Sequence, residues 1–235
     1  MNNYLCINGK KTELTEQQLH ELGIAPADEY IPENEIARMA RIALSGKAEE
    51  YYKVHDTITV GGTVFEIIGI GHDTDTITNK KNTITLRSTF TDVRAAMHDG
   101  SCPGGYKDAS LNARLTDTPD EWLPAEVLPF LRTVTKKCSN SDGEDYELPC
   151  RLFLFSESEV FGSAIYSPVE EGERYEGFAT AKDRYVYDAD GDRTHWWLRS
   201  PRSGRTDVFC SVYSGGTAGS GGASYSYGVA FGFCV

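Results

Sequence analysis

The pattern of apolar and polar positions predicts helices near the start of the chain and strands after it. Apolar residues recur at helical spacing between residues 33 and 46, which predicts an amphipathic helix just after Pro32. A shorter helix is expected from Thr15, which opens T-E-Q-Q, to Gly23. Residues 57–70 alternate and break at Gly61-Gly62, a pattern typical of a hairpin with a two-residue turn.

The rest of the chain mixes short strands and helices. Strands are expected at 83–87, at 151–155, from 196 and at 229–235, helices at 110–115 and 126–131, and an acidic loop at 139–147. Regular alternation of strand and helix is missing, so the predicted fold class is α+β. We expect a helical lead-in over residues 1–55 and one domain over 56–235. The apolar runs 196–201 and 229–235 are expected to pair within one sheet.

The segment between these two apolar runs has an unusual composition. Gly, Ser and Tyr fill most positions from Arg202 to Gly228. Such stretches are usually flexible linkers, but apolar flanks on both sides predict a segment fixed at both ends. Antibody contact loops have a similar composition. In those loops Tyr gives a large contact area with the ligand at low entropic cost, while Ser and Gly give adaptable hydrogen bonding and space. We therefore expect a non-catalytic binding protein whose ligand contacts include Tyr213, Tyr225 and Tyr227.

The same segment lacks a specific group of residue types. Residues 202–235 contain no Lys, Glu, Gln, Met or Trp, although these types fill 37 of the first 201 positions. About six would be expected at ordinary composition. Asn codons randomised at their adenines cannot encode these five types. The pattern thus suggests adenine-directed diversification, with a compositional accident as the alternative.

Charge and hydropathy narrow the classes of partner. The net charge of −12 argues against a nucleic-acid partner, which requires clustered Lys and Arg. The chain has no apolar run near the ~18 residues of a membrane span, so we expect no direct membrane insertion. The first residues do not resemble a signal peptide. The expectation is a protein that is cytoplasmic when made; its final location stays open and includes association with a virion.

The sequence contains no convincing motif for catalysis or metal binding. None of the six cysteines forms a C-x-x-C pair, so no zinc site is expected, and an oxidised Cys210–Cys234 pair stays open. The acidic run Asp188 to Asp192 resembles the start of a calcium loop, but Arg199 stands where its glutamate would be. An acidic turn is the alternative. We expect no catalytic residue, no metal and no cofactor.

Several motifs together resemble a known family. They are H-W-W-L-R-S-P at 195–201, F-C-S-V at 209–212, G-V-A-F-G-F-C-V at 228–235 and R-L-F-L-F-S-E-S-E-V-F-G at 151–162. This set is similar to the variable proteins of diversity-generating retroelements, including the phage major tropism determinant class, and to an uncharacterised domain of gut bacteria and their phages. The resemblance implies a C-type lectin-like fold of the formylglycine-generating-enzyme type, with a variable region at about 197–235.

The resemblance also implies which positions are fixed and which are diversified. The proposed framework positions are Trp196, Trp197, Leu198, Phe209, Cys210, Val212, Gly216, Ala218, Ala223, Ser226 and 228–235. The proposed variable, ligand-binding positions are Arg205, Asp207, Val208, Ser211, Tyr213, Ser214, Gly215, Thr217, Gly219, Ser220, Gly221, Gly222, Ser224, Tyr225 and Tyr227. We expect the variable side chains to converge on one exposed surface above inward-facing framework residues.

The family resemblance leads to a primary expectation and two alternatives. The primary one is a receptor-recognition protein whose partner is a protein or glycan on another cell or host surface, with the oligomeric state open. One alternative is an oxidase related to formylglycine-generating enzymes, with Cys210 and Cys234 as the reactive thiols. The other is a structural phage or surface module. An open pocket centred on a cysteine would favour the oxidase.

Overall fold

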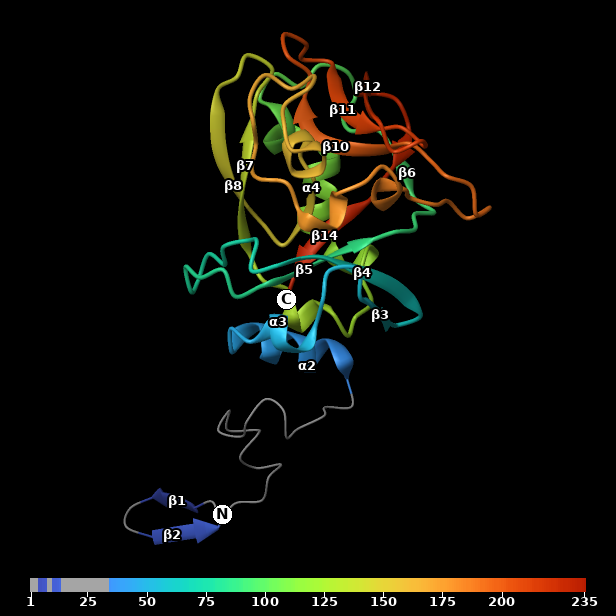
Figure 1. The fold of residues 1–235 in the computed structure, drawn as a ribbon. Coiled ribbons are helices and arrows are strands. Elements are labelled where there is room, and N and C mark those ends of the chain that lie inside the picture. Colours follow the sequence, from blue (N-terminus) through green and yellow to red (C-terminus); the bar gives the residue numbers. More distant parts are fainter. Residues whose placement is uncertain (1–3, 8–9, 14–33) are drawn as a thin grey trace.

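The computed structural model describes residues 4–7, 10–13 and 34–235 (Figure 1). Strands β1 (Tyr4–Ile7) and β2 (Lys10–Glu13) pair antiparallel. This hairpin corrects the expectation of a helical lead-in at residues 4–13, whereas the later part of the lead-in does form helices, at Glu35–Leu44 and Ala48–Tyr51. The helix expected from Thr15 to Gly23 lies outside the described residues.

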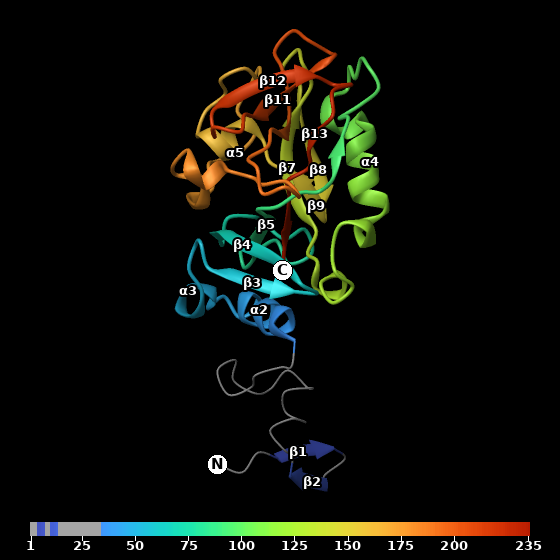
Figure 2. The ribbon, with the colours of Figure 1, turned by 90° about the vertical axis from the view of Figure 1, so that its right-hand side faces the viewer.

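Two five-stranded sheets form the main body (Figures 1 and 2). The first has the order β3-β4-β5-β14-β9 and the second the order β12-β11-β10-β13-β6. The first contains β3 (Thr57–Val60), β4 (Thr63–Ile70), β5 (Ile84–Ser88), β14 (Phe231–Cys234) and β9 (Leu152–Leu154). The second contains β12 (Ala218–Gly222), β11 (Val208–Val212), β10 (Trp196–Pro201), β13 (Tyr227–Gly228) and β6 (Arg94–Ala95).

Helices and a hairpin complete the body. The α-helices are α2 (Glu35–Leu44), α3 (Ala48–Tyr51), α4 (Ser110–Asp117) and α5 (Glu157–Phe161). Single 3₁₀ turns are η1 (Gly105–Asp108), η2 (Pro119–Glu121), η3 (Leu128–Phe130), η4 (Glu176–Phe178) and η5 (Lys182–Arg184). The hairpin pairs β7 (Val134–Ser139) with β8 (Asp145–Cys150). This mixture of sheets and helices confirms the α+β class.

Local signals explain several of these elements. The Asn34 side chain caps α2 by accepting a hydrogen bond from the Ile36 amide. Gly61 and Gly62 both have positive φ, 57° and 81°, as a tight two-residue hairpin turn requires. Ser156 and Glu159 form a reciprocal capping box at the start of α5. The α2 helix and the β3–β4 hairpin confirm the predictions made from hydrophobic spacing.

Two predicted segments differ from the structure. The segment 126–131 forms only the 3₁₀ turn η3, which contains Pro129. The acidic loop is shorter than expected, since β8 begins at Asp145 and pairs with β7. Residues of β8 alternate between exposed and half-buried over most of the strand, so polar side chains are compatible with a strand there. Acidic composition was therefore a poor guide to loop structure.

The predicted pairing of the runs 196–201 and 229–235 is wrong. Trp196 pairs in parallel with Gly228, but the chain then leaves this sheet. Residues 231–234 instead form β14, between β5 and β9 of the other sheet. Apolar flanks predicted burial correctly, but burial is equally satisfied in either of two adjacent sheets.

The buried apolar residues form two clusters. One cluster contains Trp197, Phe209 and Phe233, together with Ile36 and Met39 of α2. Residues before position 55 therefore share a core with the C-terminal strands. The other cluster contains Phe155 and Phe178 together with the strand residues Trp196, Leu198, Cys210, Val212 and Cys234. Within the described part of the chain, no helix is long and apolar enough to cross a membrane.

Candidate functional site: a tyrosine patch on the C-terminal face

The C-terminal Gly/Ser/Tyr-rich segment forms β11, β12 and their connecting turns, at the end of the body farthest from α2 (Figure 2). Strand β11 lies between β10 and β12, and the register pairs Ser211 with Gly219. Strand β12 forms the outer edge of its sheet. The segment is therefore fixed at both ends and built on a sheet, as its apolar flanks predicted.

The proposed variable positions are more exposed than the framework positions. Seven of the fifteen are exposed, namely Arg205, Asp207, Tyr213, Gly215, Thr217, Ser224 and Tyr225. Four are half-buried, namely Ser214, Ser220, Gly222 and Tyr227. Of the eighteen framework positions, all are buried except Ala218, which is half-buried, and Ser226, which is exposed. Phe209, Cys210 and Val212 are buried as expected.

Four variable positions are buried, which corrects the expectation that all fifteen are displayed. Val208 and Ser211 lie in β11, where neighbouring strands on both sides leave little access. Gly219 and Gly221 are buried by tyrosine rings. Ser211 is fully buried, and its hydroxyl makes no hydrogen bond within the described part of the chain.

Three tyrosines of this segment each lie against a glycine of β12. A Cβ added at Gly219 would lie 2.6 Å from Cζ of Tyr213, and one at Gly221 would lie 2.6 Å from Cε2 of Tyr227. At Gly222 the added atom would lie 3.4 Å from Cε1 of Tyr225. Gly219 and Gly221 thus leave the volume that the rings of Tyr213 and Tyr227 occupy, whereas the distance at Gly222 is an ordinary van der Waals contact.

Aromatic side chains form one continuous surface here, which we call the tyrosine patch: Tyr213, His195, Tyr227 and Tyr225. The ring of His195 lies 4.9 Å from that of Tyr213 and 5.6 Å from that of Tyr227, and Tyr225 lies 6.2 Å from Tyr227. Tyr227 also stacks on buried Trp197 at 4.5 Å, which anchors the patch to the core.

The patch carries little charge of its own. Burial lowers the pKa of His195, and nearby Arg94 lowers it further, which favours the neutral imidazole. At the rim, the Arg205 guanidinium donates two hydrogen bonds, of 2.9 and 3.0 Å, to the Asp207 carboxylate. Both side chains of this pair are exposed, and their charges neutralise each other. The result is an uncharged aromatic surface with a polar rim, a common form of protein interface.

The framework cysteines do not form an accessible reactive pair. Cys210 and Cys234 are both free thiols and fully buried. Burial raises the pKa of both thiols well above the usual range, and nearby carboxylates, Glu157 for Cys210 and Asp73 for Cys234, raise it further. A reactive cysteine needs the opposite, a lowered pKa and solvent access. The arrangement favours packing over catalysis.

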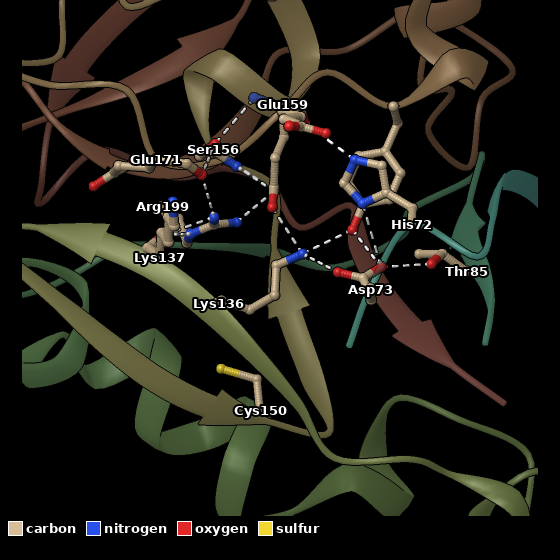
Figure 3. Close-up of polar contacts among 12 residues, drawn as sticks. His72, Asp73, Thr85, Lys136, Lys137, Cys150, Ser156, Glu159, Glu171 and Arg199 are labelled. Atoms are coloured by element: carbon tan, nitrogen blue, oxygen red, sulfur yellow. Dashed lines mark hydrogen bonds and ion pairs between the residues drawn. The ribbon is translucent and has the colours of Figure 1, made fainter. Parts of the chain in front are cut away.

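A buried ionic cluster, which the sequence analysis did not identify, lies deeper in the body (Figure 3). The Lys136 ammonium lies 2.7 Å from carboxylate oxygens of both Asp73 and Glu159, and 2.7 Å from the Tyr175 hydroxyl. Arg199 lies on the other side of Glu159, with Nη1 2.5 Å from its second carboxylate oxygen. All four charged side chains are buried.

The ionic cluster is internally saturated. The Arg199 guanidinium directs its N–H groups to Glu159 and to the carbonyls of Leu154, Lys137 and Glu171. Although burial opposes ionisation, Lys136 and His72 hold the pKa of Asp73 well below its usual range, and Arg199 and Lys136 lower that of Glu159. Two cations therefore balance two anions within the cluster.

A cavity of about 240 Å³ opens beside this cluster. Its walls include His72, Asp73, Lys136 and Glu159 and contain no cysteine. His72 is stacked on Tyr175 with ring centres 3.8 Å apart. Because the charged groups already pair with one another, this cavity offers few free polar groups to a substrate.

The acidic run at 188–192 forms a tight turn. The Asp188 carboxylate accepts hydrogen bonds from the amides of Asp190 and Asp192, and Tyr187 bridges to Arg193. Among the described residues, no group of three or more His, Cys, Asp or Glu side chains is arranged to hold a metal ion. The geometry thus matches the acidic turn, the alternative to a calcium loop.

A signal for the ionic cluster was present in the sequence. Arg199 interrupts the otherwise apolar run W-W-L-R-S-P, and a charge inside a buried strand needs a partner. Its partner Glu159 lies forty positions earlier, in a helix too short for its spacing to be recognised. The residues of the tyrosine patch were found from composition, except His195, which belongs to a motif used only for the resemblance.

Comparison with known proteins gives one match. A family model described as "Domain of unknown function (DUF6273)" matches residues 80–235, which is most of the chain and includes the whole tyrosine patch. Of the buried ionic cluster, Asp73 precedes the matched range, whereas Lys136, Glu159 and Arg199 lie within it. No curated protein and no solved structure matches. The chain belongs to the DUF6273 family.

Proposed function

We propose that this chain is a non-catalytic receptor-recognition protein that binds its ligand through the tyrosine patch and its rim. One observation carries the proposal. Eleven of the fifteen proposed variable positions are exposed or half-buried, whereas sixteen of the eighteen framework positions are buried. Solvent-exposed aromatic clusters are rare on a surface that has no partner, because they are costly to leave in water.

The family resemblance suggests how the sequence of this binding surface arose. The proposal includes a C-type lectin-like fold and diversification of the ligand-binding positions by adenine-directed mutagenesis. Its partner is a protein or glycan on another cell or on a host surface. The absence of five residue types from 202–235 supports the same idea. A reverse-transcriptase gene and a near-copy of codons 197–235 beside this gene are the expected genomic context.

Binding through the patch is tested with a double variant, Tyr213→Ser with Tyr225→Ser. These side chains are 39% and 59% exposed, so the free energy of unfolding should change by no more than about 1 kcal/mol. The fluorescently labelled chain is applied to arrays of glycans and peptides. Signals of the wild type should fall at least about tenfold in the variant, as for loss of interface anchors.

Tyr187→Ser is the matched control, because Tyr187 is 41% exposed but lies outside the patch. It should bind like the wild type. If Tyr213→Ser with Tyr225→Ser binds every wild-type ligand equally well, the patch is not the binding surface. Tyr227 is unsuitable for this test, since its ring stacks on Trp197 and its loss should also reduce stability.

A further inference from the structure

Strand β12 lies at the open edge of its sheet. Its only strand partner in the described part of the chain is β11. In an antiparallel pair, alternate residues turn their N–H and C=O groups toward the partner, and the others turn them away. An edge strand therefore presents half of its backbone groups to the outside.

The register identifies which groups face outward. Just beyond the paired strands, the Tyr213 amide bonds to the Thr217 carbonyl, and the Ala223 amide bonds to the Asp207 carbonyl. Odd-numbered residues of this ladder therefore form the hydrogen-bonded pairs. The even-numbered residues of β12, namely Ala218, Ser220 and Gly222, must turn their backbone groups away from β11.

These outward groups are almost entirely unpaired. The Gly222 carbonyl accepts a hydrogen bond from the Tyr225 amide. Within the described residues, no hydrogen bond is found for the N–H and C=O of Ala218, the N–H and C=O of Ser220 or the N–H of Gly222. These five backbone groups alternate between donor and acceptor along the edge. A further strand, antiparallel or parallel, could form hydrogen bonds with them.

The edge lacks the features that usually prevent strand addition. Proteins commonly protect an edge with Lys, Pro, a bulge or an inward-facing charge. The β12 sequence A-G-S-G-G has no charge and no proline, and its pairing with β11 runs without a register shift.

Two tyrosines of the patch, Tyr213 and Tyr227, lie on one face of the same edge. Tyr213 covers Gly219 and Tyr227 covers Gly221, so both rings lie over the odd-numbered positions. Residues of an added strand opposite Gly219 and Gly221 would project onto this face. The tyrosines would therefore contact alternate side chains of the added strand, and the backbone groups would fix its register.

We propose that the ligand of this surface is an extended peptide segment of a partner protein, added to β12 as a further strand with its alternate side chains against the tyrosine patch. This inference rests on the proposed binding function and specifies its ligand class. Main-chain hydrogen bonds would supply affinity, and contacts with the tyrosines would supply selectivity, as in other cases of strand addition.

The test begins with peptides selected on the full chain from a random library of linear peptides about ten residues long, enough to span β12. Each selected peptide is then resynthesised with one backbone N-methyl group at successive positions. N-methylation removes a donor, so loss of affinity should recur at every second residue over the paired stretch. Losses of about tenfold or more are expected at the paired positions.

A variant of the protein tests the same edge from the other side. Ser220→Pro removes an N–H that faces away from β11, so no hydrogen bond to β11 is lost. Proline is also tolerated at sheet edges. Ser220→Ala, the matched control, keeps the N–H and measures the loss of the hydroxyl alone, so Ser220→Pro should bind peptide about tenfold or more weakly than Ser220→Ala. The N-methyl scan needs only the wild type, so it remains decisive if Ser220→Pro folds poorly.

The outcomes separate this inference from the proposed function. Selected peptides that need Tyr225 but show no two-residue period would overturn strand addition and leave binding by the patch intact. A library that yields no peptide, while a glycan array gives tyrosine-dependent binding, would do the same. Self-association of the wild type that Ser220→Pro abolishes would assign the edge to a second copy of the chain. Binding that depends on neither the tyrosines nor Ser220 would refute both proposals.

Discussion

Neighbouring glycines at the end of the β11–β12 turn should respond in opposite ways to the same substitution. Gly216 has φ of +79°, and an added Cβ would lie 2.1 Å from the backbone carbonyl oxygen of Ala181. Gly215 has no such restriction, and an added Cβ would meet nothing within 4 Å. The family resemblance places Gly216 in the framework and Gly215 among the variable positions, so the pair tests that assignment directly.

The magnitude follows from two costs at Gly216. A left-handed backbone costs an L-residue roughly 1–2 kcal/mol. Crowding against a fixed backbone atom adds about 1–3 kcal/mol, because a carbonyl cannot rotate away as a side chain can. Gly216→Ala should therefore lower the free energy of unfolding by about 2–5 kcal/mol, and Gly215→Ala should change it by about 0.5 kcal/mol or less.

Urea unfolding, followed by tryptophan fluorescence, measures both variants. A loss near 3 kcal/mol corresponds to a melting temperature lower by roughly 6–12 °C in a domain of this size. An unchanged midpoint for Gly216→Ala would refute the geometry of the turn. Equal losses for Gly215→Ala would refute the distinction between variable and framework glycines.

Two further predictions concern the core and the pH dependence of stability. Trp197 is fully buried and its indole N–H donates to the Ala95 carbonyl at 2.8 Å, so Trp197→Ala should cost about 3–5 kcal/mol by urea unfolding. Unchanged stability would show that the ring is not part of the core. Although burial alone would raise it, the pKa of Asp75 falls from 3.8 to about 2, because Arg132 and the Thr78 amide donate to its carboxylate. The folded-state pKa is below the unfolded one, so this stabilisation is present above about pH 4 and is lost as the pH falls toward 2. Asp75→Asn should be less stable at pH 7 and should lose less stability between pH 4 and 2, whereas parallel pH profiles would contradict the assignment.

Local sequence signals predicted the positions of helices, strands and turns better than they predicted which strands pair with one another. Helical spacing located α2, paired glycines located the β3–β4 turn, and apolar flanks correctly indicated that the C-terminal segment is fixed at both ends. Each of these signals acts between residues close in the sequence. The placement of β14 in the other sheet depends on contacts with residues 84–88 and 152–154, which the apolar pattern of 229–235 alone cannot specify.

The candidate site shows the same limit. Composition identified the exposed tyrosines, since Tyr among Gly and Ser favours display. It could not show that Gly219 and Gly221 are buried, because the covering rings of Tyr213 and Tyr227 come from outside the strand. The ionic cluster was missed because its four charged members come from four separate segments and acquire meaning only once the chain is folded.

The contacts between tyrosines and glycines imply that positions in this surface cannot vary independently. Positions 213 and 219 share one volume, as do positions 227 and 221, because a side chain at either glycine would occupy space that a ring now fills. A bulky residue at 219 is therefore compatible with a small or displaced residue at 213, and the reverse also holds. In a library randomised at all four positions, many combinations would compete for the same space, so the usable repertoire is smaller than the product of the choices at each position. Sequences recovered from such a library should show volume at 219 rising as volume at 213 falls.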